Sequence, residues 1–121
     1  MPSLENSKPW MMIKQFEIWL ADLNPNRGTE VGKVRPVVVI QTDLLNDLHS
    51  STIVCPITSN VQRDMRLLRV FIGKRGLDQE SDILVDQIRA IDNRRFVKKI
   101  GRLQQAHVIQ LQENIKTILD L

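Results

Sequence analysis

The residues best suited to chemistry lie in one polar stretch, 25–36, which reads PNRGTEVGKVRP. It combines two glycines with one carboxylate and three cations, namely Glu30, Arg27, Lys33 and Arg35. A guanidinium offers a planar fork of donors to phosphate or carboxylate oxygens. Arg35 is the strongest candidate, because Pro36 and the β-branched run behind it predict an extended backbone. The stretch predicts either an anion-binding group or a structural ion pair at the mouth of a buried strand.

Two apolar segments flank this polar stretch and are predicted to hold its ends. Residues 15–23 and 34–41 both predict β-strands. The unbroken apolar run 37–40 indicates a strand that is covered on both faces. Rigid strands joined by a glycine-containing polar loop are a common setting for a functional site.

The remaining sequence predicts further short strands and a terminal helix. We expect a short helical turn from Thr42, with Leu44, Leu45 and Leu48 on its apolar side. Strands are expected over 52–59, 67–72, 81–92 and 96–103. Pro56 indicates a bulge or an edge position, and a slip near Gln87 could be another bulge. Residues 104–119 predict an amphipathic helix with the apolar stripe Val108, Leu111, Ile115, Ile118 and Leu119.

Length and composition indicate one small domain. The 121 residues allow a single core, which we expect over 12–121 after a loosely ordered tail at 1–11. Aromatic residues make up 4% and tyrosine is absent, which argues against an aromatic platform for stacked bases. The net charge of +3 permits a nucleic acid or an acidic protein as partner without requiring either.

Cysteine usage and apolar runs bear on the compartment. The single Cys55 excludes an internal disulfide framework and a multi-cysteine zinc site, and we expect no metal and no cofactor. No segment approaches the roughly 18 apolar residues of a membrane span. The first nine residues lack the apolar centre of a signal peptide. The sequence therefore predicts a cytoplasmic protein without a membrane partner.

Four motifs follow one another along the chain. They are EIWL at 17–20, GxExGxxRPVVVI at 28–40, PITS at 56–59 and DQIRAID at 86–92. In this order, over about residues 15–120, they resemble the PemK/MazF family of toxin endoribonucleases from bacterial type II toxin–antitoxin systems. The resemblance implies a mainly β (α+β) fold: an SH3-like small β-barrel with a short helix and a C-terminal amphipathic helix. It also implies a homodimer and a cognate acidic antitoxin.

The resemblance implies growth arrest through metal-independent cleavage of single-stranded RNA, which leaves 2′,3′-cyclic phosphate and 5′-hydroxyl ends. The ribose 2′-hydroxyl must lose a proton and attack phosphorus, the phosphorane needs positive charge, and the leaving oxygen needs a proton. By this resemblance Arg35 stabilises the transition state, since its pKa above about 12 makes it a poor acid. Thr58, with Ser59, hydrogen-bonds the phosphate, and Glu30 or Asp86 accepts the proton.

Each of these assignments has a structural alternative. Glu30 could pair with a loop cation and hold the loop shut, and Asp86 could tie down Arg89. Thr58 could be an ordinary strand residue. For the whole chain, the alternative to an enzyme is a non-catalytic small barrel that binds RNA or a protein.

Polar residues of the flanking loops are the candidates for RNA binding. Cations should add salt-dependent affinity, while amides suit the edges of unpaired bases. The candidates are Arg27, Thr29, Lys33, Ser59, Asn60, Gln62, Arg63, Arg66 and Gln87. The chain departs from the family pattern at Thr29, where some members carry histidine, at Val31, where many carry glutamine, and at Phe16, where glycine is frequent.

Overall fold

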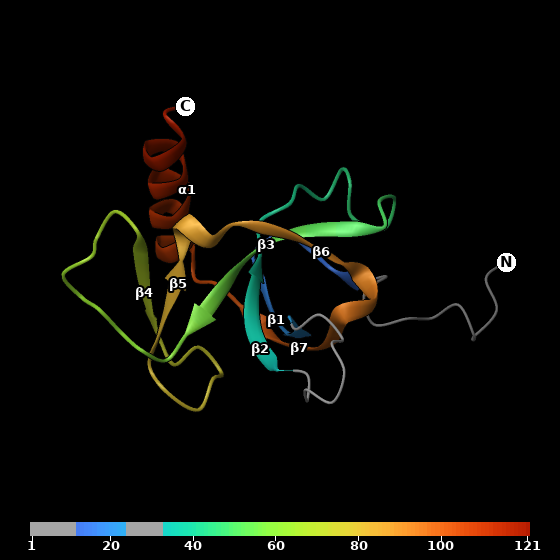
Figure 1. Cartoon of the computed structure of the whole chain (residues 1–121), viewed down its shortest axis with the longest axis horizontal. Helices are drawn as coiled ribbons and strands as arrows, with labels where there is room; N and C mark the ends of the chain where they lie inside the picture. Colours follow the sequence, from blue (N-terminus) through green and yellow to red (C-terminus); the bar gives the residue numbers. More distant parts are fainter. Residues whose placement is uncertain (1–11, 24–32) are drawn as a thin grey trace, which may run out of the picture.

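The computed structural model describes residues 12–23 and 33–121, which form seven strands and a C-terminal helix (Figure 1). The expected mainly β class with a terminal helix is confirmed. The tail predicted at 1–11 and most of the loop 24–33 lie outside the described residues. In chain order the elements are β1 (Glu17–Asp22), β2 (Val34–Val39), β3 (Ser51–Thr58), β4 (Arg69–Gly73), β5 (Ser81–Leu84), η3 (Val85–Gln87), β6 (Arg89–Asp92), η4 (Asn93–Arg95), β7 (Phe96–Arg102) and α1 (Gln105–Leu119).

The strands pair antiparallel in the order β4-β5-β3-β2-β1-β7, and β6 pairs with β3. In the described part of the chain β4 and β7 end this path without pairing with each other, so the sheet is not closed. The expected small barrel is therefore an open, bent sheet. One edge of β3 pairs with two strands in turn, first β6 and then β5.

Pro56 lies where β3 changes its neighbour. On one edge Pro56 is opposite Val37 of β2. On the other edge the pairing passes from β6 at Val54 to β5 at Ile57. Because proline has no N–H to donate, it fits at this change of partner without breaking a ladder. The irregularity predicted at Pro56 is thus a switch between strands.

The predicted strand 81–92 is two strands separated by a 3-10 turn. β5 pairs with β4 and with the end of β3, whereas β6 pairs with the first half of β3. The slip in alternation near Gln87 marks η3 between them, not a bulge. In this turn Val85 is buried and Asp86 is exposed.

The short helical turn expected after Thr42 is a run of turns that does not continue into a helix. Residues 43–48 form successive hydrogen-bonded turns. Asp47 has φ 71, a left-handed conformation that ends a right-handed helix. Leu44 and Leu48, on the expected apolar side of this turn, are 81% and 83% exposed.

Apolar side chains cover both faces of the central strands. Along β2, Val37 and Val39 belong to one buried cluster and Val38 belongs to the other, as the unbroken apolar run predicted. α1 stands beside β4 and β5 in Figure 1 and joins the second cluster through Val108, Leu111, Ile115 and Ile118. Leu119, predicted for the same stripe, is 49% exposed. No helix in the described part of the chain is long and apolar enough to cross a membrane.

Phe16 explains one departure from the family pattern. Its φ is 67, a conformation in which glycine is unstrained. Its N–H donates to the Val39 carbonyl at 2.7 Å, and its carbonyl accepts from the Leu103 N–H at 3.0 Å. The ring packs against the core, so burial offsets the strained backbone.

Candidate active site

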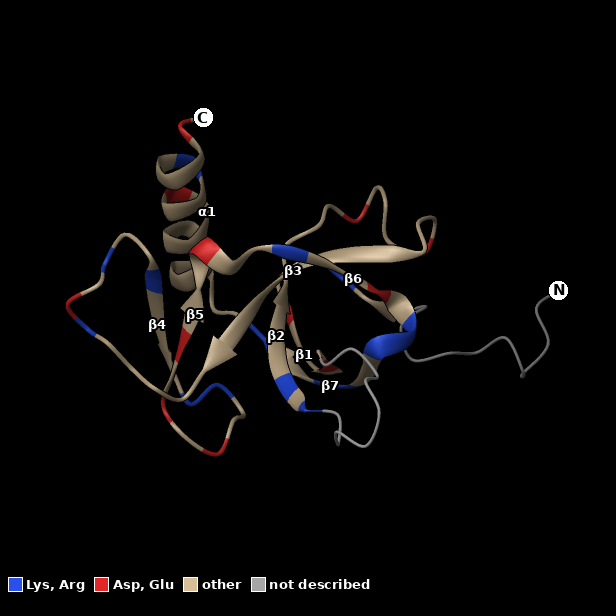
Figure 2. Cartoon of the chain, in the orientation of Figure 1, with Lys and Arg blue, Asp and Glu red and all other residues tan. Residues whose placement is uncertain are grey.

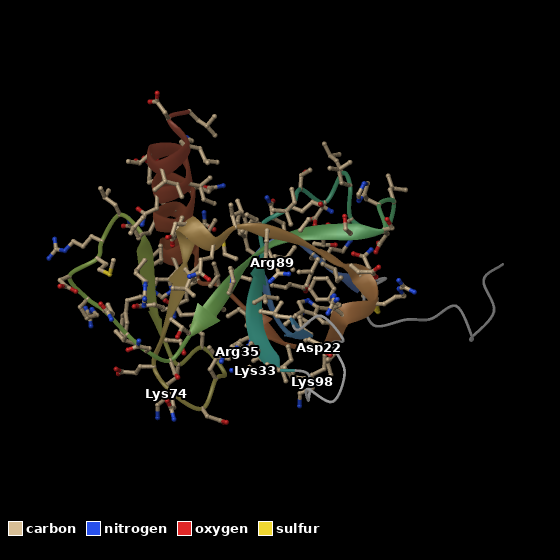
Figure 3. All side chains as sticks on the ribbon, viewed as in Figure 1. Asp22, Lys33, Arg35, Lys74, Arg89 and Lys98 are labelled. Atoms are coloured by element: carbon tan, nitrogen blue, oxygen red, sulfur yellow. The ribbon has the colours of Figure 1, made fainter. Side chains whose placement is uncertain are left out.

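A cleft of about 780 Å³ opens where β2 begins. It lies among β1, β2, the end of β3, β7 and the β4–β5 loop, and we call it the Arg35 cleft. Its polar lining includes Lys33, Arg35, Ser59, Asp78, Lys98 and Lys99. Figure 3 shows Lys33, Arg35 and Lys98 at the same end of the sheet.

Positive charge dominates this cleft. Within residues 12–23 and 33–121, Lys33, Arg35 and Lys98 form no ion pair. Asp78 is the single carboxylate among the described lining residues. Figure 2 shows the basic positions at the start of β2. Cations without a protein counter-ion, gathered in a cleft, suit an anionic ligand such as a phosphodiester.

Lys99 differs from these cations because it is held by a buried carboxylate. Lys99 Nζ lies 2.6 Å from Glu17 Oε2. Glu17 Oε1 also accepts from the Lys14 N–H at 2.8 Å and from Trp19 Nε1 at 3.1 Å. Glu17 is 3% exposed, so this network fixes the wall of the cleft formed by β1 and β7.

Arg35 and Thr58 lie at the same end of two adjacent strands. The β2–β3 register places Val37 opposite Pro56. Extending this antiparallel register by two residues places Arg35 opposite Thr58. Opposite residues of an antiparallel pair carry their side chains on the same face. Thr58 does not line the Arg35 cleft, whereas the residues on both sides of it do.

A buried ion pair anchors the loop that follows Thr58. Asp82 Oδ2 accepts from Arg69 Nη1 at 3.1 Å and from the Gln62 N–H at 2.8 Å. Arg69 Nη1 also donates to the Asn60 carbonyl at 2.7 Å. The Asn60 N–H donates to Thr58 Oγ1 at 3.1 Å. These bonds hold the end of β3 and the first residues of the loop in one geometry.

A family model described as "PemK-like, MazF-like toxin of type II toxin-antitoxin system" matches residues 14–119. This chain belongs to that family. The identification covers all seven strands and α1, and it agrees with the order of motifs along the chain.

Relatives and solved structures of the MazF-like family match nearly the whole chain. Endoribonuclease MazF of Staphylococcus epidermidis is 37% identical over 112 residues, 91% of this chain and 93% of that protein. Endoribonuclease EndoA of Bacillus subtilis (strain 168) is 36% identical over 113 residues, 92% and 97% of the two chains. Mycobacterium tuberculosis toxin MazF-mt6 superposes with a TM-score of 0.74 at 25% identity, covering 87% and 97%. The MazE-MazF (Form-II) structure from Deinococcus radiodurans superposes with a TM-score of 0.76 at 19% identity, covering 90% and 96%, a likeness of fold.

The MazF-like fold brings only some of the predicted site residues together. Lys33, Arg35 and Ser59 share the Arg35 cleft. Asp86 and Gln87 are exposed on η3 and line neither this cleft nor the second one described below. Asn60 is exposed on the loop after β3. Gln62, Arg63 and Arg66 line the second cleft. The remaining candidates lie outside the described residues: Arg27, Thr29 and Glu30.

Sequence reasoning missed Asp82, Arg69 and Asp78. The Asp82–Arg69 pair joins two strands, and no local pattern in the sequence marks such a contact. The sequence offers one weak signal for Asp82, which is that it stands beside the apolar Ile83. The structure shows that this strand is buried on both faces, where a carboxylate needs a partner. Asp78 reaches the cleft only because the β4–β5 loop folds toward β7.

Other reactive groups of this MazF-like chain are unsuited to the site. Burial raises the pKa of the Cys55 thiol to about 12, with a further contribution from the charge of Asp86. Cys55 is fully buried, as the sequence predicted, and a neutral thiol is a poor nucleophile. Among the described residues, no group of three His, Cys, Asp or Glu side chains could hold a metal ion.

Proposed function

We propose that this chain is the toxin of a type II toxin–antitoxin pair and cuts single-stranded RNA without a metal ion, at a phosphodiester bound in the Arg35 cleft. Endoribonuclease activity follows from membership of the MazF-like family and from two endoribonuclease relatives that align over nearly the whole chain. The observation that carries the location is the gathering of Lys33, Arg35 and Lys98, without ion-pair partners among the described residues, beside the end of β3.

The chemistry assigned to this cleft needs positive charge more than a proton donor. The 2′-hydroxyl oxygen bonds to phosphorus while its proton goes to a base, and the bond from phosphorus to the 5′-oxygen breaks as that oxygen takes a proton from water. Arg35 supplies the fork of donors for the equatorial oxygens of the phosphorane. Thr58 and Ser59 donate hydroxyl hydrogen bonds to the same phosphate. The products are a 2′,3′-cyclic phosphate and a 5′-hydroxyl.

Glu30 is our choice for the group that accepts the 2′-hydroxyl proton. Asp86, the other candidate, is exposed on η3 and lines neither cleft. A general base must lie within hydrogen-bond reach of the hydroxyl whose proton it takes, which excludes an exposed residue outside the cleft. Glu30→Gln is therefore expected to lower kcat far more than Asp86→Asn does.

The test is cleavage of single-stranded RNA by purified protein in EDTA, with sequencing of the ends. Wild-type protein should cut and leave 2′,3′-cyclic phosphates. Arg35→Ala and Thr58→Ala should each lower kcat by about 100-fold or more, the loss typical of removing one transition-state donor. Lys74→Ala removes an exposed cation outside both clefts and should cut normally. Undiminished cutting by both site variants would overturn the assignment, and binding without cutting would favour a non-catalytic module.

The same proposal includes the partners of the toxin. An acidic antitoxin segment over the Arg35 cleft would neutralise its cations and block RNA, and a MazE-MazF complex is among the structures of this fold. We further propose a homodimer that acts in the cytoplasm, where RNA substrates are found. Sedimentation equilibrium of the purified toxin tests the dimer, and a small acidic open reading frame beside the gene tests the antitoxin.

A further inference from the structure

A second cleft, of about 550 Å³, lies between the loop 60–68, β4 and the first turns of α1. We call it the α1 cleft. Figure 2 shows basic positions along this loop and at the start of β4, next to an acidic position in β5. The residues that bear on its chemistry are Gln62, Arg63, Arg66, Phe71, His107 and Gln110.

A flat, positively charged surface forms one wall of the α1 cleft. The guanidinium carbon of Arg63 lies 4.0 Å from the centroid of the Phe71 ring. The guanidinium thus lies over the ring, and Arg63 is exposed while Phe71 is half-buried. Unpaired RNA bases stack on guanidinium planes and on aromatic rings.

Hydrogen-bonding groups surround this surface. Gln62 and Gln110 each offer an amide, and Gln110 Nε2 is held by a bond to Asn114 Oδ1 at 2.7 Å. Two buried atoms of lining residues, His107 Nδ1 and Asp82 Oδ1, have no hydrogen-bond partner among the described residues. Because both atoms are themselves buried, they do not contact a ligand in the cleft, and its uncharged polar lining consists of the side chains of Gln62, Gln110 and His107.

The two clefts are neighbours along the loop. Ser59 lines the Arg35 cleft and Gln62 lines the α1 cleft. Three residues of chain span at most about 10 Å. Ser81 lines the Arg35 cleft and Asp82 lines the α1 cleft, so the clefts lie on opposite sides of β5, and an RNA strand bound in both would pass around the loop at 59–62. Arg66, which lines the α1 cleft, adds a cation for a phosphate of the same RNA strand.

We propose that the α1 cleft holds one unpaired base of the RNA substrate, stacked on the Arg63 guanidinium and read at its edge by Gln62, Gln110 and His107. This inference rests on the proposed function, because it makes the cleft a specificity site of that RNA-cleaving enzyme. Stacking supplies affinity for any base, whereas the amides and the imidazole distinguish bases by their donors and acceptors.

The first experiment measures base binding without cleavage. The four nucleoside 5′-monophosphates and ribose 5-phosphate are titrated separately into the full chain, and the methyl signal of Met65, a lining residue, is followed by NMR. At least one nucleotide should bind about tenfold more tightly than ribose 5-phosphate, as expected for one stacked base. Equal affinities would show a plain anion site and overturn the proposal.

Two variants with a matched control locate the base. Arg63→Gln and Phe71→Leu should remove the tenfold advantage of the nucleotide. Arg89→Gln loses the same charge from an exposed position on β6 that lines neither cleft, and it should retain the advantage. Thermal unfolding shows whether Phe71→Leu still folds. If it does not, the Arg63→Gln variant alone is the test, because Arg63 is exposed. A retained advantage in Arg63→Gln would refute the assignment.

The second experiment separates this proposal from the proposed function. Arg35→Ala should abolish cutting yet bind nucleotides as wild type does. In substrates that lack one base at a time, removal of one base near the cut should raise KM about tenfold in wild type, with little change in kcat. The same removal should have no effect in Arg63→Gln. If the wild type cuts RNA but no single base removal raises KM, the base site is refuted and the proposed function stands. If the wild type does not cut RNA at all, the proposed function is refuted, and the nucleotide titrations still test the base site.

Discussion

The buried pair of Arg69 and Asp82 should link stability to the loop that carries the site. The Asp82 side chain is 1% exposed and that of Arg69 is 15% exposed. Asp82 Oδ2 accepts two hydrogen bonds, one from Arg69 and one from the Gln62 N–H, and Oδ1 has no partner among the described residues. Removal of Arg69 therefore leaves a buried carboxylate with one neutral donor.

The magnitudes follow from this geometry. Arg69→Met should lower the free energy of unfolding by about 3–5 kcal/mol, the loss for breaking one side of a buried pair. Asp82→Asn keeps an acceptor for the Gln62 N–H, and water reaches part of Arg69, so a loss of about 2 kcal/mol is expected. The double variant buries no charge and should be more stable than Arg69→Met, which requires a coupling energy larger than the Asp82→Asn loss, about 3 kcal/mol.

Urea unfolding, followed by circular dichroism, measures the free energy of unfolding of the wild type, the two single variants and the double variant. The free energies come from linear extrapolation, and the dependence on urea concentration (the m value) should be the same in all four proteins. The expected single losses are a large share of the roughly 5–15 kcal/mol that stabilises a small domain, so they should be easy to resolve. Losses that add in the double variant would refute the reasoning, because independent residues have no coupling energy. The double variant should also cut RNA with a reduced kcat, since Asn60 and Thr58 lose their anchor.

Four further results are expected. Native Cys55, with its pKa raised to about 12 by burial, should resist dithiobisnitrobenzoate at pH 8 and react at once in urea. This folded pKa lies above the ordinary value of 9.0, so the unfolded chain loses the thiol proton first as the pH rises. The free energy of unfolding should therefore fall above pH 9 by up to about 1.4 kcal/mol per pH unit more than that of Cys55→Ala. The same dependence on pH in both proteins would contradict this. Gly76 has φ 87, and an added Cβ would lie 3.2 Å from Ile100 Cγ2. Gly76→Ala should therefore lose about 1–2 kcal/mol of stability in thermal unfolding. Gly73→Ala is the control and should lose less, because its Cβ would meet nothing within 4 Å. Burial and then the charge of Arg75 lower the pKa of His107, so the unfolded chain takes up its proton first and stability should decline as the pH falls below about 6.5. His107→Gln should flatten that decline between pH 7.5 and 5, and an identical decline would exclude His107 as its source.

Predictions based on local patterns agreed with the structure where burial follows from neighbouring residues. The helix predicted at 104–119 is α1, and the run 37–40 lies in or next to β2, which is covered on both faces. The same reasoning failed at 42–48, because the pattern of leucines carries no information about the left-handed backbone of Asp47. It also read 81–92 as one strand, since the two partners that β3 takes in succession are set by long-range pairing.

The amino-acid sequence alone determined the family, the strand and helix content, and Arg35 as the leading cation of a phosphate site, because motif order and hydrophobic periodicity are properties of consecutive residues. Only the tertiary structure decided which distant residues meet. It paired Arg69 with Asp82, gathered Lys98 and Asp78 beside Arg35, and laid Arg63 on Phe71 in a chain whose 4% aromatic content argued against a stacking surface. The physical reason is that such contacts depend on strand register and loop path, which are fixed by the packing of the whole sheet and not by any one segment.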